Sequence, residues 1–451
     1  MIRKKRVHWR RLVTVVLAGT MLFCTGCASF RNDTEKNGSE PVKDDQLQID
    51  SVVENICETD TEAVEERTAE TIFIDETEVE PSEEISSEEI ASKEISSEEI
   101  YSGDRVEEIL NGMSIEQKVA QMFFITPDAL TGVGSVTASG EMTREALQQY
   151  PVGGLIYFEN NLLSREQTQG MLSSVQEFSR EITGLPLFLG VDEEGGSVSR
   201  ISGRGFGVPD IEDMAQIGAA EDYDRAEETG RIMGGYLHEL GFNMDFAPCA
   251  DVLTNPENTV VARRSFGSDA NLVADMISRQ ICAMQQEQIC AVPKHFPGHG
   301  ATSGDSHNGY AYTDKSLEEL YSRELIPFQR AIDERVQMIM VGHIACPNVT
   351  GSDIPASLSE YMITNVLRTR MGFQGLVITD ALNMGAIQEA YTSAQAAITA
   401  LHAGVDLLLM PADFQSAYYG VIQAVNSGEI SEERIDESVR RIIRLKLFLE
   451  K

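Results

Sequence analysis

Basic residues are scarce in this chain, which has 36 Lys and Arg against 72 Asp and Glu in 451 residues and a net charge of −36 at pH 7. A chain this acidic repels phosphates, so the composition argues against nucleic acid as a partner. The C-terminal part also lacks a zinc-binding pattern, because Cys249, Cys282, Cys290 and Cys346 show neither a CxxC pair nor zinc-ribbon spacing. We interpret these four cysteines mainly as small buried hydrophobes, and the sequence leaves open whether any two are bonded.

The N-terminal apolar run, LVTVVLAGTMLFC at residues 12–24, is too short for a comfortable membrane span. It follows six basic residues, an order typical of a secretory signal peptide, which we predict for residues 1–26. The run continues into FCTGCASF, which resembles a bacterial lipoprotein cleavage box with Cys27 as the lipidated first residue, although Cys24 stands where such boxes usually carry leucine. An uncleaved anchor helix is the alternative. We expect the bulk of the chain outside the cytoplasm, with the lipid on the outer face of the cytoplasmic membrane.

Aromatic residues are rare in residues 31–103, which carry 24 acidic and 5 basic residues, a net charge of −19. The sequence EISSEEI occurs there at residues 84–90 and again at 94–100. Such a segment cannot bury enough apolar surface to offset the entropy of ordering it, so we predict a disordered acidic tether over residues 27–103. A solvated helix or short coiled coil is the alternative, but isoleucines that recur every five residues fit neither helical period.

Short apolar runs of β type alternate with longer amphipathic stretches over residues 104–451. The runs are QMFFIT at 121–126, GGLIYF at 153–158, LPLFLGVD at 185–192, FNMDFAP at 242–248, CAVPKHF at 290–296, QMIMVGHI at 337–344, GLVITD at 375–380 and VDLLLMP at 405–411. Nearly continuous apolar strands joined by helices are typical of a parallel sheet that is buried on both faces. Eight such runs predict an α/β fold with a (β/α)8 barrel, and an open doubly wound sheet is the alternative.

Polar residues follow several of these predicted strands. Asp192 ends the third run, Lys294 and His295 lie near the end of the fifth, His343 is the second-last residue of the sixth, and Asp380 ends the seventh. In a barrel the carboxyl ends of the strands surround one mouth, so these side chains are expected to lie together. Carboxylates, a cation and imidazoles around one pocket suit the binding of a neutral polyhydroxylated ligand together with acid–base chemistry.

Several ordered motifs resemble glycoside hydrolase family 3, in particular its β-N-acetylglucosaminidase branch. They are KHFPGHG followed by DSH, with VDEEGG upstream and ITDALNMGAI downstream, and the resemblance covers essentially all of residues 104–451. The β-glucosidase and β-xylosidase branches generally need a second sandwich domain, for which this sequence leaves no room, so we expect the glucosaminidase branch. The resemblance therefore implies a retaining enzyme that removes terminal β-linked N-acetylglucosamine from cell-wall-derived or related glycans, with no cofactor and as a monomer.

Roles for single residues follow from the resemblance by position. It implies that Asp380 is the nucleophile and that Asp305 and His307 form a dyad in which His307 is the general acid and base. The positions that bind the sugar correspond to Asp192, Arg200, Arg264, Lys294 and His295. Glu193 and Ser197 stand where the family commonly has Gln and Arg, which leaves the details of the neighbouring subsite open.

The chemistry of the KHFPGHGATSGDSHNGY segment is consistent with these roles. Retaining cleavage needs a carboxylate that attacks the anomeric carbon and a proton donor for the leaving oxygen. A histidine such as His307 titrates near neutrality, and Asp305 can accept one of its ring N–H groups. His295 is expected to hold the substrate and His299 to shape the loop. Taken alone, Asp380 could instead cap a helix and His295 could be a satisfied strand-end residue.

Three other functions compete with this one. A metal site formed by His295, His299 and His307 is disfavoured, because spacings of four and eight across a Pro-Gly loop do not give the helical HExxH arrangement, and we expect no metal. A non-catalytic wall-binding lipoprotein would not need Asp305, His307 and Asp380 together. Phosphorolysis, or a β-glucosidase or β-xylosidase activity, on the same scaffold is the third alternative. Phosphorolysis competes because a neutral histidine repels phosphate less than a carboxylate does.

Replacing Cys27 with alanine tests the predicted lipid anchor. We expect Cys27→Ala to leave unprocessed precursor and to abolish labelling by a radioactive or clickable fatty acid, because the modified thiol is lost. Cys24→Ala serves as the matched control and should keep its label. Unchanged labelling of Cys27→Ala would contradict the assignment.

Overall fold

The computed structural model describes residues 103–303 and 311–450. The chain divides into two units, Met1–Ser82 and Glu83–Lys451, and the first lies wholly outside the described residues. The predicted signal peptide, 1–26, and all of the predicted tether except Gly103 lie outside them as well. Every helix and strand with described residues therefore belongs to the second unit.

Eight parallel strands form a closed ring within the described part of the chain. They are β1 (Phe123–Ile125), β2 (Gly154–Ile156), β3 (Phe188–Val191), β4 (Met244–Asp245), β5 (Cys290–Ala291), β7 (Met338–Val341), β9 (Leu376–Thr379) and β10 (Leu408–Leu409). One sheet has the order β10-β1-β2-β3-β4-β5, and β7 pairs with β9. Parallel bridges from Phe296 to Val341 and from Ile378 to Leu407 join these two sheets on both sides. The ring has no open edge, so the architecture is a parallel barrel rather than an open doubly wound sheet.

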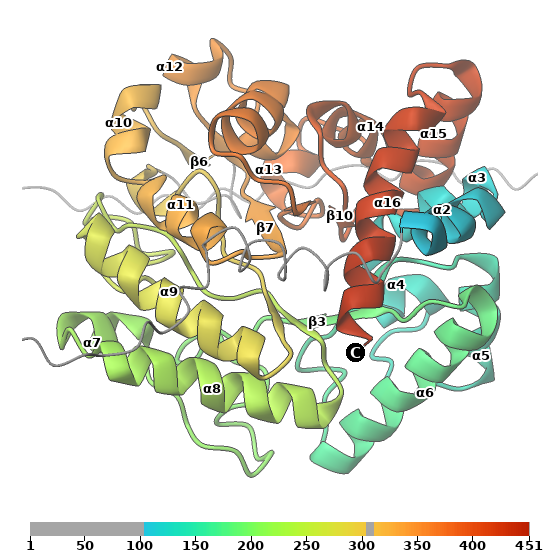
Figure 1. Ribbon diagram of the computed structural model, residues 1–451, viewed down its shortest axis with the longest axis horizontal. Coiled ribbons are helices and arrows are strands. Elements are labelled where there is room, and N and C mark those ends of the chain that lie inside the picture. Colours follow the sequence, from blue (N-terminus) through green and yellow to red (C-terminus); the bar gives the residue numbers. More distant parts are fainter. Residues whose placement is uncertain (1–102, 304–310, 451) are drawn as a thin grey trace, which may run out of the picture. The chain divides into compact units, whose positions relative to one another are not determined.

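Helices connect successive strands and cover the outside of the barrel (Figure 1). In chain order they are α2 (Gly103–Gly112), α3 (Ile115–Gln121), α4 (Pro127–Thr131), α5 (Glu141–Gln149), α6 (Arg165–Thr183), α7 (Met214–Ala219), α8 (Tyr223–Leu240), α9 (Ala270–Gln286), α10 (Leu317–Ser322), α11 (Ile326–Asp333), α12 (Pro347–Thr350), α13 (Gly385–Gln388), α14 (Ser393–Ala403), α15 (Phe414–Ser427) and α16 (Glu432–Leu449). Shorter additions are the 3-10 turns η1 (His299–Ala301) and η2 (Ala356–Leu358), the π-helix η3 (Tyr361–Arg370), and a small sheet of β6 (Ala311–Tyr312) and β8 (Ile344–Ala345).

The ends of the main helices are set by residues visible in the sequence. Helix α14 begins with a capping box at Thr392, whose hydroxyl accepts from the backbone N–H of Gln395, and it ends at Gly404 in a left-handed conformation with φ 107°. A glycine adopts such a positive φ without the steric penalty that a Cβ brings. Helix α8 is likewise capped by Asp222 and ends at Gly241. These caps fix where each helix begins and ends between the two strands that it connects.

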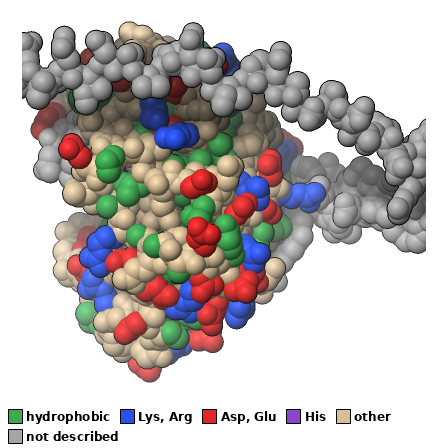
Figure 2. Space-filling view, turned by 90° about the vertical axis from the view of Figure 1, so that its left-hand side faces the viewer, with side chains coloured by type: hydrophobic (Ala, Val, Ile, Leu, Met, Phe, Trp, Pro, Cys, Tyr) green, Lys and Arg blue, Asp and Glu red, His purple; other side chains and the backbone are tan. Residues whose placement is uncertain are grey.

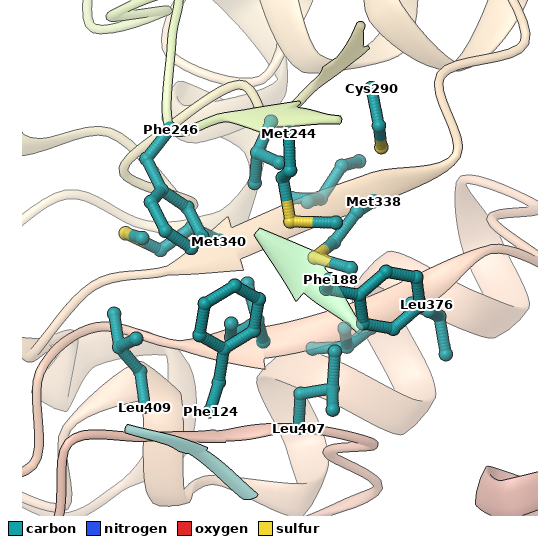
Figure 3. Packing of buried hydrophobic residues seen from close by; sticks show 14 of the residues in the cluster. Phe124, Phe188, Met244, Phe246, Cys290, Met338, Met340, Leu376, Leu407 and Leu409 are labelled. Atoms are coloured by element: carbon teal, nitrogen blue, oxygen red, sulfur yellow. The ribbon is translucent and has the colours of Figure 1, made fainter. Parts of the chain in front are cut away.

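Large apolar side chains fill the barrel (Figure 3). The Phe124 ring stacks on Phe188 with a centroid distance of 6.4 Å and meets Phe246 edge to face at 5.3 Å. Glycines make room for it, since a Cβ at Gly154 would lie 2.6 Å from the Phe124 ring and one at Gly190 would lie 3.0 Å from it. The interior is therefore a packed core, and only its carboxyl end is free to form a site.

The sequence anticipated this fold closely. Each of the eight predicted strand segments contains one of the eight barrel strands, although the strands are shorter than the apolar runs. The π-helix η3 and the small β6–β8 sheet were not anticipated. In the described part of the chain, no helix has the length and apolar character that a bilayer crossing requires.

Charges of both signs cover the outside of the barrel. Figure 2 shows the side that carries α7, α8 and α9 at the left of Figure 1, and there basic and acidic side chains are interspersed. Arg225, for example, pairs with Glu212 at 2.6 Å and with Glu228 at 2.7 Å. Exposed pairs of this kind contribute about 0–1 kcal/mol each, so the stability of the domain rests mainly on its apolar core.

One lysine, Lys446 of α16, is buried with only 1% of its surface exposed. Its Nζ donates to Gln121 Oε1 at 2.7 Å and lies 5.2 Å from the centre of the Phe188 ring. No carboxylate accompanies it among the described ion pairs, and burial lowers the pKa of Lys446 to about 7. The folded state therefore binds this proton less tightly than the unfolded chain does.

Replacing Lys446 with methionine should change how stability depends on pH. Since the folded-state pKa is lowered, wild-type stability rises with pH between the folded and unfolded values. We expect the free energy of unfolding of the wild type, relative to Lys446→Met, to rise by about 2 kcal/mol from about pH 7 to about pH 9. Denaturant titrations of both proteins at each pH measure it, and parallel pH profiles would contradict the assignment.

Candidate active site

A cleft of about 680 Å³ opens at the carboxyl ends of the barrel strands. Its described lining comes from the segments that follow β2, β3, β4, β5, β9 and β10, and from Met340 of β7. Six residues singled out by the sequence lie together in its wall: Asp192, Arg200, Arg264, Lys294, His295 and Asp380. The closed barrel thus brings to one cleft residues that follow four different strands.

A buried lysine connects two acids that follow β3. Lys294 Nζ lies 2.7 Å from Asp192 Oδ1 and 2.6 Å from Glu194 Oε1. Burial lowers the pKa of Lys294, but the two carboxylates outweigh this effect and the net shift is upward, so the ammonium stays charged. Asp192 keeps 19% of its side chain exposed and faces the cleft, whereas Glu194 is 2% exposed.

Arg264 completes this network from the segment after β4. Its Nε and Nη2 each donate to Glu194 at 2.7 Å, which is the parallel two-bond geometry that a guanidinium and a carboxylate form best. Burial raises the pKa of Glu194, but Arg264 and Lys294 hold that pKa well below its usual range. Glu194 is therefore a permanent anion that fixes both cations in the cleft wall.

Asp251 holds His295 in one orientation. Asp251 is fully buried, and its carboxylate accepts from the His295 backbone N–H at 3.2 Å and contacts His295 Nδ1 at 2.7 Å. It also accepts from the His299 backbone N–H at 2.5 Å and from the Cys249 thiol at 3.1 Å. Burial raises the pKa of Asp251, but the neighbouring histidines lower it overall, so the carboxylate can only accept. The proton of His295 therefore sits on Nδ1, and Nε2 accepts from Arg264 Nη2 at 3.2 Å.

Asp380 stands where β9 ends at the cleft. Its backbone N–H donates to Val341 O at 2.8 Å, and its Oδ1 accepts from the Ala381 N–H at 2.7 Å. Burial raises the pKa of Asp380, but His343, His295 and the Ala381 N–H lower it overall, which leaves an ionised carboxylate at neutral pH. Unlike Asp192 and Glu194, which also line the cleft, Asp380 takes part in none of the described ion pairs.

His343 supports this end of β9 from the neighbouring strand. The imidazole is fully buried, with Nε2 2.9 Å from Ala381 O and Nδ1 2.7 Å from Ser357 Oγ. A carbonyl oxygen can only accept, so Nε2 carries a proton and holds the backbone next to Asp380.

Apolar residues also line the cleft. Phe158, Ile156, Leu409 and Met410 line the cleft from the segments around β2 and β10. The cleft therefore combines a charged wall, which can bind hydroxyl groups by charge-assisted hydrogen bonds, with an apolar wall and an ionised carboxylate.

Some of the predicted site lies outside the described residues, namely Asp305, His307 and Cys27. His299 lines the cleft, and its Nδ1 lies 3.0 Å from Thr302 Oγ1. Sequence reasoning missed Glu194, although it lies in the quoted VDEEGG motif. It also missed Asp251. The only sequence feature that could have indicated it is an acidic residue six positions after a strand.

One compact group of metal-ligating side chains occurs in residues 103–303 and 311–450, formed by Cys249, Asp251 and His295. The Asp251 oxygens already accept from four donors there, and Arg264 lies against the other side of His295. These contacts fit an acid that orients an imidazole, and all four described cysteines are free.

Residues 114–445 match the protein family described as "Glycosyl hydrolase family 3 N terminal domain". Two similar curated proteins are named as β-hexosaminidases. Beta-hexosaminidase A of Pseudoalteromonas piscicida is 32% identical over 329 residues, which is 68% of this chain and 55% of that protein. Beta-hexosaminidase LpqI of Mycobacterium tuberculosis is 37% identical over 271 residues, 58% of this chain and 68% of that protein.

A solved structure of a glycoside hydrolase family 3 β-N-acetylglucosaminidase from Paenibacillus sp. str. FPU-7 has the same fold. It is 36% identical with a TM-score of 0.70, and the match covers 75% of this chain and 63% of that one. The chain thus spans between about half and two thirds of the length of these relatives.

Proposed function

Because the chain belongs to glycoside hydrolase family 3, we propose that it is a retaining β-N-acetylglucosaminidase that removes terminal β-linked N-acetylglucosamine from cell-wall-derived or related glycans. The family membership predicted from the KHFPGHG, VDEEGG and ITDALNMGAI motifs is confirmed. The β-hexosaminidase names of relatives that are 32% and 37% identical support the substrate class. The observation that carries the proposal is one cleft in which an ionised Asp380 faces the Lys294–Glu194–Arg264 network.

In the proposed reaction, an Asp380 oxygen forms a bond to the anomeric carbon while the bond from that carbon to the leaving oxygen breaks. His307 gives its proton to the leaving oxygen. In the second step His307 takes a proton from water, the water oxygen attacks the anomeric carbon, and Asp380 leaves as a carboxylate. After the two steps, Asp380 and His307 have returned to their starting charge and protonation states.

The described acids of the cleft support a proton donor from another segment. Glu194 is held ionised by Arg264 and Lys294, and Asp192 is paired with Lys294. Glu194 therefore holds no proton for the leaving group at neutral pH, and the Asp192 carboxylate is engaged by the Lys294 ammonium. We therefore assign proton transfer to His307, oriented by Asp305, and sugar binding to Asp192, Arg200, Arg264, Lys294 and His295.

The N-terminal sequence supports a location outside the cytoplasm. We propose that the protein is a monomer attached through lipidated Cys27 to the outer face of the cytoplasmic membrane, with residues 27–103 as a tether. A surface location fits a glycan substrate in the cell wall.

A panel of aryl β-glycosides that differ only at the sugar 2-position tests the substrate class. We expect kcat/KM for the 2-acetamido sugar to exceed that for the 2-hydroxy sugar by at least about a hundredfold, which corresponds to about 3 kcal/mol of selective transition-state binding. Retained β-configuration in the first product, observed by NMR, would support the double displacement. A preference for the 2-hydroxy sugar would overturn the proposed substrate.

Replacing Asp380 and replacing His307 should block different steps of the reaction. Asp380→Asn should abolish the covalent glycosyl-enzyme with every leaving group, because the amide is a poor nucleophile. His307→Ala should slow substrates with poor leaving groups by about 10²–10⁴-fold and activated ones much less, since an activated phenolate leaves without a proton. The intermediate then lacks its general base, so an activated substrate should give a burst followed by a slow steady state.

Asp305→Ala serves as the graded control and should resemble a milder His307→Ala, because the imidazole remains but loses its partner. Leaving groups of graded acidity, followed by stopped-flow absorbance, measure all three variants. Equal loss for good and poor leaving groups in His307→Ala, without a burst, would contradict the assigned role.

A further inference from the structure

Glu193 lies between two acids of the cleft but faces away from it. Its neighbours Asp192 and Glu194 line the cleft and pair with Lys294, whereas Glu193 is absent from the lining and is fully buried. Successive side chains of an extended segment point to opposite sides, which explains why the middle acid points the other way. Among the ion pairs of the described residues, none includes Glu193.

Five donors surround the Glu193 carboxylate instead. They are Ser199 Oγ at 2.7 Å, Ser202 N at 2.8 Å and Tyr236 OH at 2.7 Å to Oε1, and Arg200 N at 2.6 Å and Ile201 N at 3.0 Å to Oε2. Four of the five come from the turn at residues 199–202, and three of those are consecutive backbone N–H groups. These donors satisfy both oxygens of the buried carboxylate.

Hydrogen bonds hold both the backbone and the side chain of Glu193. Its backbone N–H donates to Asp245 Oδ1 at 2.9 Å on β4, and its side chain accepts from Tyr236 on α8. Burial raises the pKa of Asp245 well above its usual value, and the charge of Glu193 adds to this shift. The Glu193 segment is therefore held from β4 through its backbone and from α8 through its side chain.

The turn that Glu193 holds carries Arg200 into the cleft. The Arg200 guanidinium lies over the Phe158 ring at 5.6 Å, and Nη1 is 3.5 Å from Glu159 Oε2. Both contacts are loose and partly exposed, since the Glu159 side chain is 53% exposed. The tightest contact of Arg200 is the one between its backbone N–H and Glu193.

We propose that Glu193 is a positioning residue that fixes Arg200 in the substrate cleft by accepting the hydrogen bonds of the 199–202 turn. This inference rests on the proposed glycosidase function for its kinetic consequence. Glutamine would keep most of these contacts, because its oxygen can accept from the Arg200 and Ile201 N–H groups while its NH₂ donates to hydroxyl oxygens. Alanine removes every acceptor, so the four donors of the turn would all lose their partner.

Removing the side chain in Glu193→Ala tests the proposal by kinetics. With an aryl β-N-acetylglucosaminide we expect KM to rise by about tenfold or more, while kcat falls by less than about threefold, because Asp380 lies on a different strand and is untouched. Competitive inhibition by free N-acetylglucosamine should weaken by the same factor. An unchanged KM in Glu193→Ala would overturn the proposal.

Tyr236→Phe is the matched control. It removes one 2.7 Å donor from the same Glu193 oxygen, but that donor comes from α8 and not from the turn. We expect thermal stability to fall in both variants and KM to stay within about twofold of wild type in Tyr236→Phe. Equal rises of KM in the two variants would show a general loosening and would overturn the proposal.

A double-mutant cycle separates positioning from stability. If Glu193 acts through Arg200, adding Glu193→Ala to Arg200→Ala should raise KM by less than about twofold. Additive effects would overturn the proposal. If Glu193→Ala does not fold, Ser199→Ala replaces it in the cycle, with a smaller expected rise in KM of about threefold.

Amide hydrogen exchange gives a readout that does not depend on activity. The amides of Arg200, Ile201 and Ser202 should exchange at least about tenfold faster in Glu193→Ala than in wild type, and at the wild-type rate in Tyr236→Phe. Unchanged exchange in Glu193→Ala would overturn the proposal. If the wild type hydrolyses no 2-acetamido glycoside but the two variants show this exchange pattern, the proposed function is overturned and Glu193 still holds the turn.

Discussion

Closure of the eight parallel strands is the constraint on which the site depends. The bridges Phe296–Val341 and Ile378–Leu407 complete the ring, and with it every strand delivers its carboxyl end to one mouth. Phe124 and its neighbours fill the interior, so polar groups are excluded from the barrel itself and collect at its rim. A cleft that contains residues from β3, β5 and β9 exists only because these strands share one closed sheet.

Buried charges at that rim are stabilised as a group. Lys294 and Arg264 are both mostly buried, and each would be costly without a partner. Glu194 contacts both of them, and Asp192 contacts Lys294, so the cations are held rigidly while Asp192 still reaches the cleft. Such a wall presents fixed donors and acceptors to a ligand and needs little reorganisation when the ligand binds.

Three consecutive acids after β3 have three different environments. Asp192 faces the cleft, Glu194 neutralises two cations, and Glu193 accepts backbone and hydroxyl donors on the far side. Alternation of side chains along an extended segment separates the first two uses from the third. One short motif thus links the strand, the ion-pair network and the turn that carries Arg200.

The sequence by itself determined the strand segments, the helix ends and the family. These features are local: apolar runs of β type, capping residues such as Thr392 and Gly404, and motif residues at strand ends such as Asp192, His295 and Asp380. Only the tertiary structure decided how the acids are used. Asp251 meets His295 across 44 positions, Glu193 meets Tyr236 across 43, and Lys446 meets Gln121 across 325. Whether an acid binds substrate, neutralises a cation or positions a turn depends on the donors that the fold brings to it from distant segments. A local sequence pattern does not include those donors, so it does not predict the role.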